Sequence, residues 1–166
     1  MYSAQYLFRV AKIICVAAIG LMSLLVVVGN TTDYYTNYDF VQHVLKMDTI
    51  FPGSKLQYRS IHSNTFFHLA YLLIILTEAA MAICCIWGTF VLCRNLKKDA
   101  SSFNASKNWA VAGIILGILI WFIGFEVIGG EWFAMWQSAA WNGLASAERI
   151  LSFLVLTLML LHLRDE

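Results

Sequence analysis

The segment Ile114–Phe125 reads Ile-Ile-Leu-Gly-Ile-Leu-Ile-Trp-Phe-Ile-Gly-Phe, without a polar side chain at any position. A strand of a spanning β-barrel alternates apolar and polar residues, whereas a helix that crosses a bilayer is apolar on every side. The segment Leu21–Val28 has the same character apart from Ser23. Both segments therefore favour membrane-spanning helices over barrel strands.

The composition of the whole chain extends this conclusion. Of its 166 residues, 60% are hydrophobic, 13% are charged and only one is proline. Soluble domains are nearer half apolar and a quarter charged, and a globule of this size leaves much of its surface wet. We therefore exclude a free soluble protein, a disordered chain and a disulfide-stapled domain. The net charge of +1 gives no basic field for nucleic acid, so the lipid bilayer is the expected partner.

Four segments are long and apolar enough to cross a membrane as helices, since about 20 residues span the hydrocarbon core. The sequence predicts a single integral membrane domain, an all-α bundle of four transmembrane helices with short interfacial helices in its outer loops. The expected spans are 6–29, 66–93, 109–130 and 144–163. The expected connections are an outer loop at 30–65, a cytoplasmic loop at 94–108 and an outer cap at 131–143.

Lysine and arginine predict the orientation of this bundle. One side carries seven of them, namely Arg9, Lys12, Arg94, Lys97, Lys98, Lys107 and Arg164. The other side carries four, namely Lys46, Lys55, Arg59 and Arg149. Because cytoplasmic loops carry the excess of positive charge, we expect both termini in the cytoplasm.

Two outer segments carry local signals. Val41–Met47 has apolar residues at helical spacing, which predicts a short helix on the membrane surface before a turn at Pro52-Gly53. Trp132 and Trp136 are four residues apart, and we expect them on one face of a short capping helix. They fit either an interfacial tryptophan belt or an aromatic pocket for a lipid or quinone-like ligand.

Glu78 is the deepest charged residue, twelve residues into the second span. An intramembrane carboxylate must be neutral, paired or in contact with water. One interpretation is a protonated Glu78 hydrogen-bonded to Ser23 or Ser152, which lie at comparable depth. The other makes Glu78 a proton or cation relay, or a ligand contact.

Glu126 and Arg149 lie at similar expected depths below the outer boundary, on neighbouring antiparallel helices. We expect an ion pair between them that staples the two helices together, with Glu148 as the alternative partner of Arg149. Gly113 and Gly117 form a small-xxx-small pair, which predicts close packing inside the bundle and, less favoured, a homodimer.

Three histidines lie on the outer side and have Asp48 and Glu131 within possible reach: His43, His62 and His68. Histidine and carboxylate together make a metal site conceivable. Their spacing matches no known ligand pattern, however, so the sequence assigns no metal ligand and no cofactor.

The chain resembles the bacterial predicted small integral membrane proteins known as domain of unknown function 2165. The resemblance covers nearly the whole chain and rests on Asn30–Asp33, His43–Thr49, Glu78, Gly129–Ser138 and Trp141–Gly143. It implies four spans and a location in the bacterial cytoplasmic (inner) membrane, but no activity that can be transferred. It also implies that the polar groups of both outer segments lie near Glu78 and Glu126, around an outward-facing cavity.

These observations favour a multi-pass membrane protein, not an enzyme, that binds a membrane-protein partner or a small or lipidic ligand at its outer cap. The candidate cap residues are His43, Asp48, His68, Glu131, Trp132, Trp136, Gln137 and Trp141. The candidate intramembrane polar residues are Glu78, Glu126, Glu148 and Arg149. One alternative is a small proton- or cation-coupled transporter that uses Glu78 and Glu126. The other is a metal- or haem-binding redox subunit.

Overall fold

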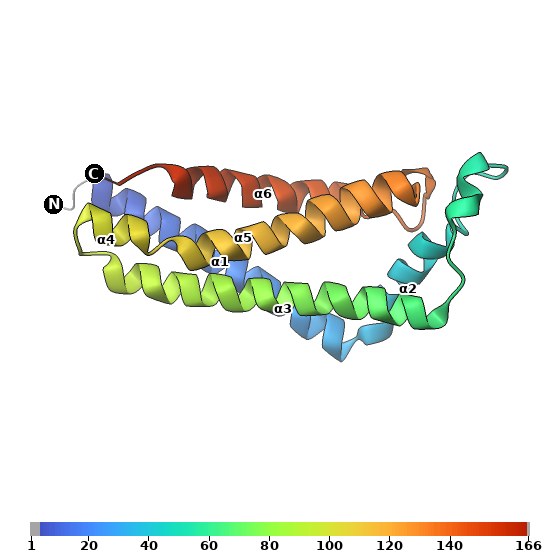
Figure 1. The fold of residues 1–166 in the computed structure, drawn as a ribbon, viewed down its shortest axis with the longest axis horizontal. Coiled ribbons are helices and arrows are strands. Elements are labelled where there is room, and N and C mark those ends of the chain that lie inside the picture. Colours follow the sequence, from blue (N-terminus) through green and yellow to red (C-terminus); the bar gives the residue numbers. More distant parts are fainter. Residues whose placement is uncertain (1–3, 166) are drawn as a thin grey trace.

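The structure, a computed structural model, describes residues 4–165 and is built from four long helical rods (Figure 1). Each rod is long and apolar enough to cross a membrane, which confirms the expected all-α, four-helix architecture. The rods are α1 (Ala4–Thr32), α3 (Asn64–Asn95), α5 (Asn108–Ile118) continued by η2 (Leu119–Trp132), and α6 (Leu144–His162). Which of these residues lie in the bilayer, and which side the termini face, remain predictions.

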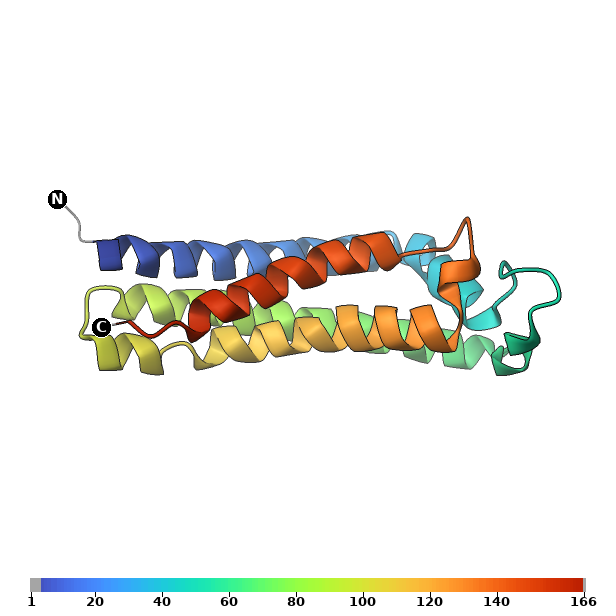
Figure 2. The ribbon, with the colours of Figure 1, turned by 90° about the horizontal axis from the view of Figure 1, so that it is seen from above.

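Four shorter helices lie at the two ends of the bundle: α2 (Tyr34–Lys46), η1 (Lys55–Arg59), α4 (Ala100–Ala105) and η3 (Met135–Gln137). Figures 1 and 2 show α4 beside the start of α1 and the end of α6, which we call the α4 end. The same views place α2 and the loop that contains η1 at the opposite end, which we call the cap end.

Packing in the bundle depends on small residues where α3 meets α5. The helix α3 packs along both α1 and α5, while α6 packs against α5 and η2 and also touches α1. A Cβ atom at Gly88 would lie 2.6 Å from the backbone nitrogen of Ala110. A Cβ at Gly113 would meet the side chain of Cys85, and one at Gly117 would meet Met81. The expected packing of Gly113 and Gly117 inside the bundle is thus confirmed.

The buried stripe of α1 determines where polar groups enter the core. Its buried residues include Arg9, Val16, Ser23 and Asn30, spaced seven apart and therefore on one helical face. Between Lys12 and Asn30 this buried face is apolar apart from Ser23, whereas Arg9 lies at the α4 end and Asn30 near the cap end. One helix thus delivers a polar side chain to the interior at each end of the bundle.

A second apolar cluster lies at the cap end and fixes α2 in place. Tyr38 and Leu45 of α2 are buried against Phe67 and Tyr71 of α3 and against Phe133, which follows η2. This helix begins at Tyr34, earlier than the expected Val41. Its buried residue Tyr38 also lies before the apolar pattern from which the helix was predicted. Met47 ends the helix in the left-handed conformation, with a φ of 52°.

The capping helix expected to carry both Trp132 and Trp136 is not formed, so that prediction is wrong. Trp132 ends η2, a π-helical segment in which Phe133 N donates to Ile128 O at 2.9 Å. Ala134 then adopts a left-handed φ of 52°, which interrupts the helix before Trp136. The two indoles therefore belong to different elements and share no helical face.

Candidate functional site

Glu78 lies on the buried face of α3, where only 3% of its surface is exposed. Its carboxylate Oε2 accepts a hydrogen bond from Asn30 Nδ2 at 2.8 Å. The expected bond from a hydroxyl to this carboxyl is wrong: Ser23 Oγ donates to the backbone carbonyl of Glu78, and Ser152 Oγ donates to the carbonyl of Glu148. Glu78 is therefore bound through an amide that the sequence interpretation missed.

A chain of amides connects this carboxyl to the surface at the cap end. Asn37 Nδ2, on α2, donates to Asn30 Oδ1 at 2.7 Å, and Asn37 itself is exposed. Tyr71 Oη donates to the backbone carbonyl of Asn30 at 3.3 Å. The chain forms because α1 ends at Thr32 and α2 starts at Tyr34, which brings Asn37 back over Asn30. Hydrogen bonds thus run from exposed Asn37 through Asn30 to buried Glu78.

Aromatic rings surround the surface end of this chain. Tyr34 Oη and His68 Nδ1 lie 2.9 Å apart, and the His68 ring stacks on Tyr38 with centroids 4.3 Å apart. Tyr34 also meets Tyr71 edge-on, with centroids 4.8 Å apart. Burial raises the pKa of the Tyr34 phenol, and the phenols of Tyr38 and Tyr35 raise it further. Tyr34 therefore remains a protonated phenol at neutral pH.

The other predicted cap residues form separate pairs. His43 Nδ1 lies 2.9 Å from Asp48 Oδ1, and its ring stacks on Trp141 at 4.5 Å. Trp136 meets Phe51 edge-on at 5.9 Å. Among the predicted cap residues, only His68 therefore joins the rings beside the Glu78 chain, whereas His43, Asp48 and Trp141 form their own cluster.

Hydrogen bonds between distant loops hold the exposed part of the cap together. Buried Gln137 accepts at Oε1 from the backbone nitrogen of Phe51 at 3.2 Å. Arg59 Nη1 donates to the carbonyls of Glu131 and Trp132, and its guanidinium lies 4.7 Å from the centroid of the Trp132 ring. The side chains of Glu131 and Trp132 remain exposed. These contacts thus join loops that are far apart in the sequence into one cap surface.

The expected ion pair of Arg149 with Glu126 or Glu148 is wrong. Among the described residues the ion pairs involve only Asp165 and Asp48 as anions. Arg149 lies about 200° around α6 from buried Ala147, at 100° per residue, and is therefore exposed. Glu126 lies in η2, which is a π-helix and has more residues per turn than an α-helix. The expected pairing with Arg149 assumed α-helical geometry at this position.

The described part of the chain contains no group of side chains that could bind a metal ion. No three or more histidine, cysteine, aspartate or glutamate side chains come together there in a way that could hold an ion. His62 Nε2 lies 3.1 Å from Ser60 Oγ, whereas His43 pairs with Asp48 and His68 with Tyr34. The three histidines grouped by sequence are therefore in three separate surroundings.

The four apolar rods and their buried carboxyl define a multi-pass integral membrane protein. A family model described as predicted small integral membrane protein (DUF2165) matches residues 8–164, and the chain belongs to this family. The resemblance noted from the sequence is thereby confirmed. No curated protein and no solved structure matches the chain.

Proposed function

We propose that this membrane protein binds a small ligand at its cap end and that the Glu78 carboxyl recognises it. The observation that carries this proposal is the hydrogen-bonded chain from exposed Asn37 through Asn30 to Glu78. A carboxyl at such depth is expensive to keep and generally serves a function. Here it is also connected to the surface, which a purely structural carboxyl does not require.

The surroundings of Glu78 favour a ligand with an organic ammonium group. Within residues 4–165 no lysine, arginine or histidine forms an ion pair with Glu78, and Asn30 supplies a neutral donor. Two aromatic side chains lie near it: Tyr71 donates to the carbonyl of Asn30, and Tyr34 contacts the Tyr71 ring edge-on. A carboxyl near aromatic faces is the combination that attracts such cations. The excess of lysine and arginine at the α4 end supports a cap on the outer side of the cytoplasmic membrane, because positive charge gathers on the cytoplasmic side.

Transport past Glu78 has less support than binding. On the α4 side of Glu78, Thr89 Oγ1 donates to the carbonyl of Cys85 in its own helix. Ser23 likewise donates to a backbone carbonyl. Buried Thr157 has no side-chain hydrogen bond within the described part of the chain that would extend the path. Among residues 4–165, the polar chain thus reaches Glu78 from the cap end and does not continue beyond it, as expected of a binding site.

Isothermal titration calorimetry on the detergent-solubilised protein tests this proposal. The probes are tetramethylammonium, choline and ethanolamine, each titrated into the wild type, Glu78→Gln and Glu126→Gln. We expect at least one probe to bind the wild type and Glu126→Gln alike, and to bind Glu78→Gln roughly tenfold more weakly or not at all. Glu126 is the matched control because it is a half-buried glutamate in the same half of the bundle. Equal binding by Glu78→Gln, or no binding of any probe to the wild type, would contradict the proposal.

A second candidate function is docking of a membrane-protein partner on the exposed cap surface. Arg59 lies over Trp132 and beside Tyr58, and these residue types dominate the binding energy of many interfaces. Tyr58 is 76% exposed, although its neighbours are held by hydrogen bonds between loops. This surface is therefore preorganised, which lowers the entropy lost on binding.

Photo-crosslinking in membranes tests the docking candidate. A benzoyl-phenylalanine at position 58 is compared with one at Tyr35, which is 67% exposed at the same end. We expect one defined protein adduct from position 58, absent from position 35 and lost in Arg59→Ala/Trp132→Ala. Adducts with lipid alone would show that these aromatic residues form an interfacial belt.

A further inference from the structure

Three buried cations meet one buried carboxylate at the α4 end. Lys12 Nζ and Lys107 Nζ lie 2.7 and 2.8 Å from Asp165 Oδ2, and Arg9 Nε lies 3.5 Å from Asp165 Oδ1. The side chains of all four are at most 9% exposed. Arg9 and Lys12 come from α1, Lys107 precedes α5, and Asp165 follows α6. Elements from both halves of the sequence thus converge on one carboxylate.

The backbone around Asp165 is held in the same place. The carbonyl of Leu163 accepts hydrogen bonds from Lys12 at 2.8 Å and from Lys107 at 3.0 Å. Asn104 of α4 donates to the carbonyl of Asp165 and accepts from its backbone nitrogen, at 2.9 and 3.2 Å. The short segment after α6 therefore inserts its carboxylate between the cations much as a bound ligand would.

The charges at this site are not balanced within residues 4–165. Three cations face one carboxylate, and the buried Nε of Arg9 has no hydrogen-bond partner despite its ion-pair distance to Asp165. Buried charges that lack a counter-charge are destabilising. The site therefore attracts an anion with more charge and more acceptor oxygens than one carboxylate.

We propose that Arg9, Lys12 and Lys107 form a binding site for a phosphate group, and that Asp165 competes with this group for the same cations. Phosphate presents several acceptor oxygens, and its hydrogen bonds to arginine and lysine are charge-assisted. Basic pockets between transmembrane helices at a membrane surface are typical sites for anionic lipid headgroups.

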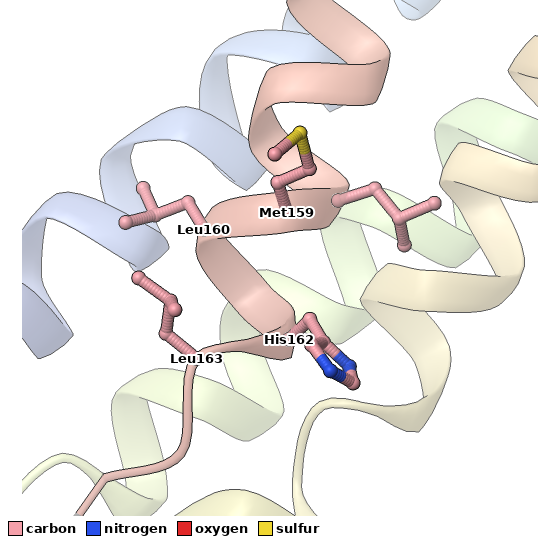
Figure 3. A pocket seen from close by; sticks show the side chains of 5 residues that line it. Met159, Leu160, His162 and Leu163 are labelled. Atoms are coloured by element: carbon pink, nitrogen blue, oxygen red, sulfur yellow. The ribbon is translucent and has the colours of Figure 1, made fainter.

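An apolar groove beside the site favours a lipid as the source of the phosphate. The groove has a volume of about 550 Å³ and is lined by Leu158, Met159, Leu160, His162 and Leu163 (Figure 3). Leu163 belongs both to this groove and to the charged site, through its carbonyl. A phospholipid can thus place its phosphate between the cations and an acyl chain along α6, whereas free phosphate would use the cations alone.

The test measures binding to the purified full chain in a non-ionic detergent. The probes are dihexanoyl phosphatidylglycerol, zwitterionic dihexanoyl phosphatidylcholine and inorganic phosphate. We expect phosphatidylglycerol to bind, roughly tenfold more weakly in Lys12→Gln/Lys107→Gln and roughly tenfold more tightly in Asp165→Asn. The control Lys97→Gln/Lys98→Gln removes two exposed lysines at the same end and should keep wild-type affinity.

Hydrogen–deuterium exchange on the wild type keeps the proposal testable if the buried-site variants do not fold. Phosphatidylglycerol should accelerate exchange at the Asp165 amide, which bonds to Asn104, and phosphatidylcholine should not. Binding of phosphatidylglycerol alone identifies a lipid headgroup, and equal binding of inorganic phosphate identifies free phosphate; both support the phosphate site. Failure of both anionic probes to bind, or equal losses in the exposed-lysine control, would overturn it.

Discussion

Glu78 and Asp165 are both buried carboxyl groups, but the side chains that surround them differ in charge. Glu78 accepts a hydrogen bond from the neutral amide of Asn30 and has no cationic partner among the described residues. Asp165 lies within ion-pair distance of three cations, two of them from the same helix α1 that supplies Asn30. Toward the cap end, the bundle thus has a carboxyl without a cationic partner. At the α4 end, it has a cluster with more cations than carboxylates.

This difference indicates which kind of ligand each end can accept. A carboxyl that holds only an amide can exchange that amide for a proton or an ammonium group. A cluster with surplus cations can exchange its carboxylate for a stronger anion. The two proposed ligands therefore carry opposite charges, a cation at the cap end and an anion at the α4 end. Substitutions that change the charge of a site but not its shape should distinguish them.

Removal of the carboxylate of Asp165 should have the largest effect on stability. Asp165→Ala leaves three buried cations without their counter-charge, and such one-sided changes typically cost about 3–5 kcal/mol. Unfolding in mixed micelles with increasing SDS, followed by circular dichroism, measures the loss. The control Asp39→Ala removes an exposed carboxylate at the cap end and should stay close to wild type. A wild-type midpoint for Asp165→Ala would show that the cations do not depend on it.

Acid should reproduce part of this loss at the α4 end. Burial acts to raise the pKa of Asp165, but hydrogen bonds from Lys107 and Lys12 and their charges outweigh it and hold this pKa below the ordinary 3.8. The ionised group therefore stabilises the fold above pH 3.8, and this contribution disappears as the pH falls through the lower folded pKa. Unfolding midpoints of wild type and Asp165→Asn should converge over that range. A difference between the two midpoints that stays constant with pH would show that ionised Asp165 does not stabilise the fold.

Loss of Asn30 should have an intermediate effect. Asn30→Ala leaves the Glu78 carboxyl and the Asn37 amide without their shared partner, whereas the backbone carbonyl that accepts from Tyr71 is retained. An unsatisfied buried polar group costs about 1–3 kcal/mol, which SDS unfolding would detect. Asn95→Ala is the control because the Asn95 side chain donates to the carbonyl of Val91 in its own helix. Equal effects of the two variants would show that the amide chain adds nothing specific.

The four rods were predictable from the sequence because unbroken apolar runs allow few alternatives. The contacts at the two ends of the bundle were not predictable, because they depend on where the chain turns back. The apolar periodicity of the sequence does not encode those turns. Asn30 carried one usable signal, its position seven residues after Ser23 on the buried stripe of α1. Asp165 carried none, since its partners Lys12 and Lys107 are separated from it by 153 and 58 positions in the chain.

The smallest effect on stability should come from Glu78→Gln, and it tests the comparison most directly. The new amide oxygen can still accept from Asn30, so the change should cost under about 1 kcal/mol, as for a retained neutral hydrogen bond. The equivalent change Asp165→Asn keeps the shape but removes the carboxylate that pairs with three cations in the described part of the chain, and should cost several times more. SDS unfolding of both variants, measured side by side, gives this ratio. If Glu78→Gln were as destabilising as Asp165→Asn, Glu78 would have to be an ionised and paired carboxylate, and the two ends of the bundle would not differ in the sign of the ligand they accept.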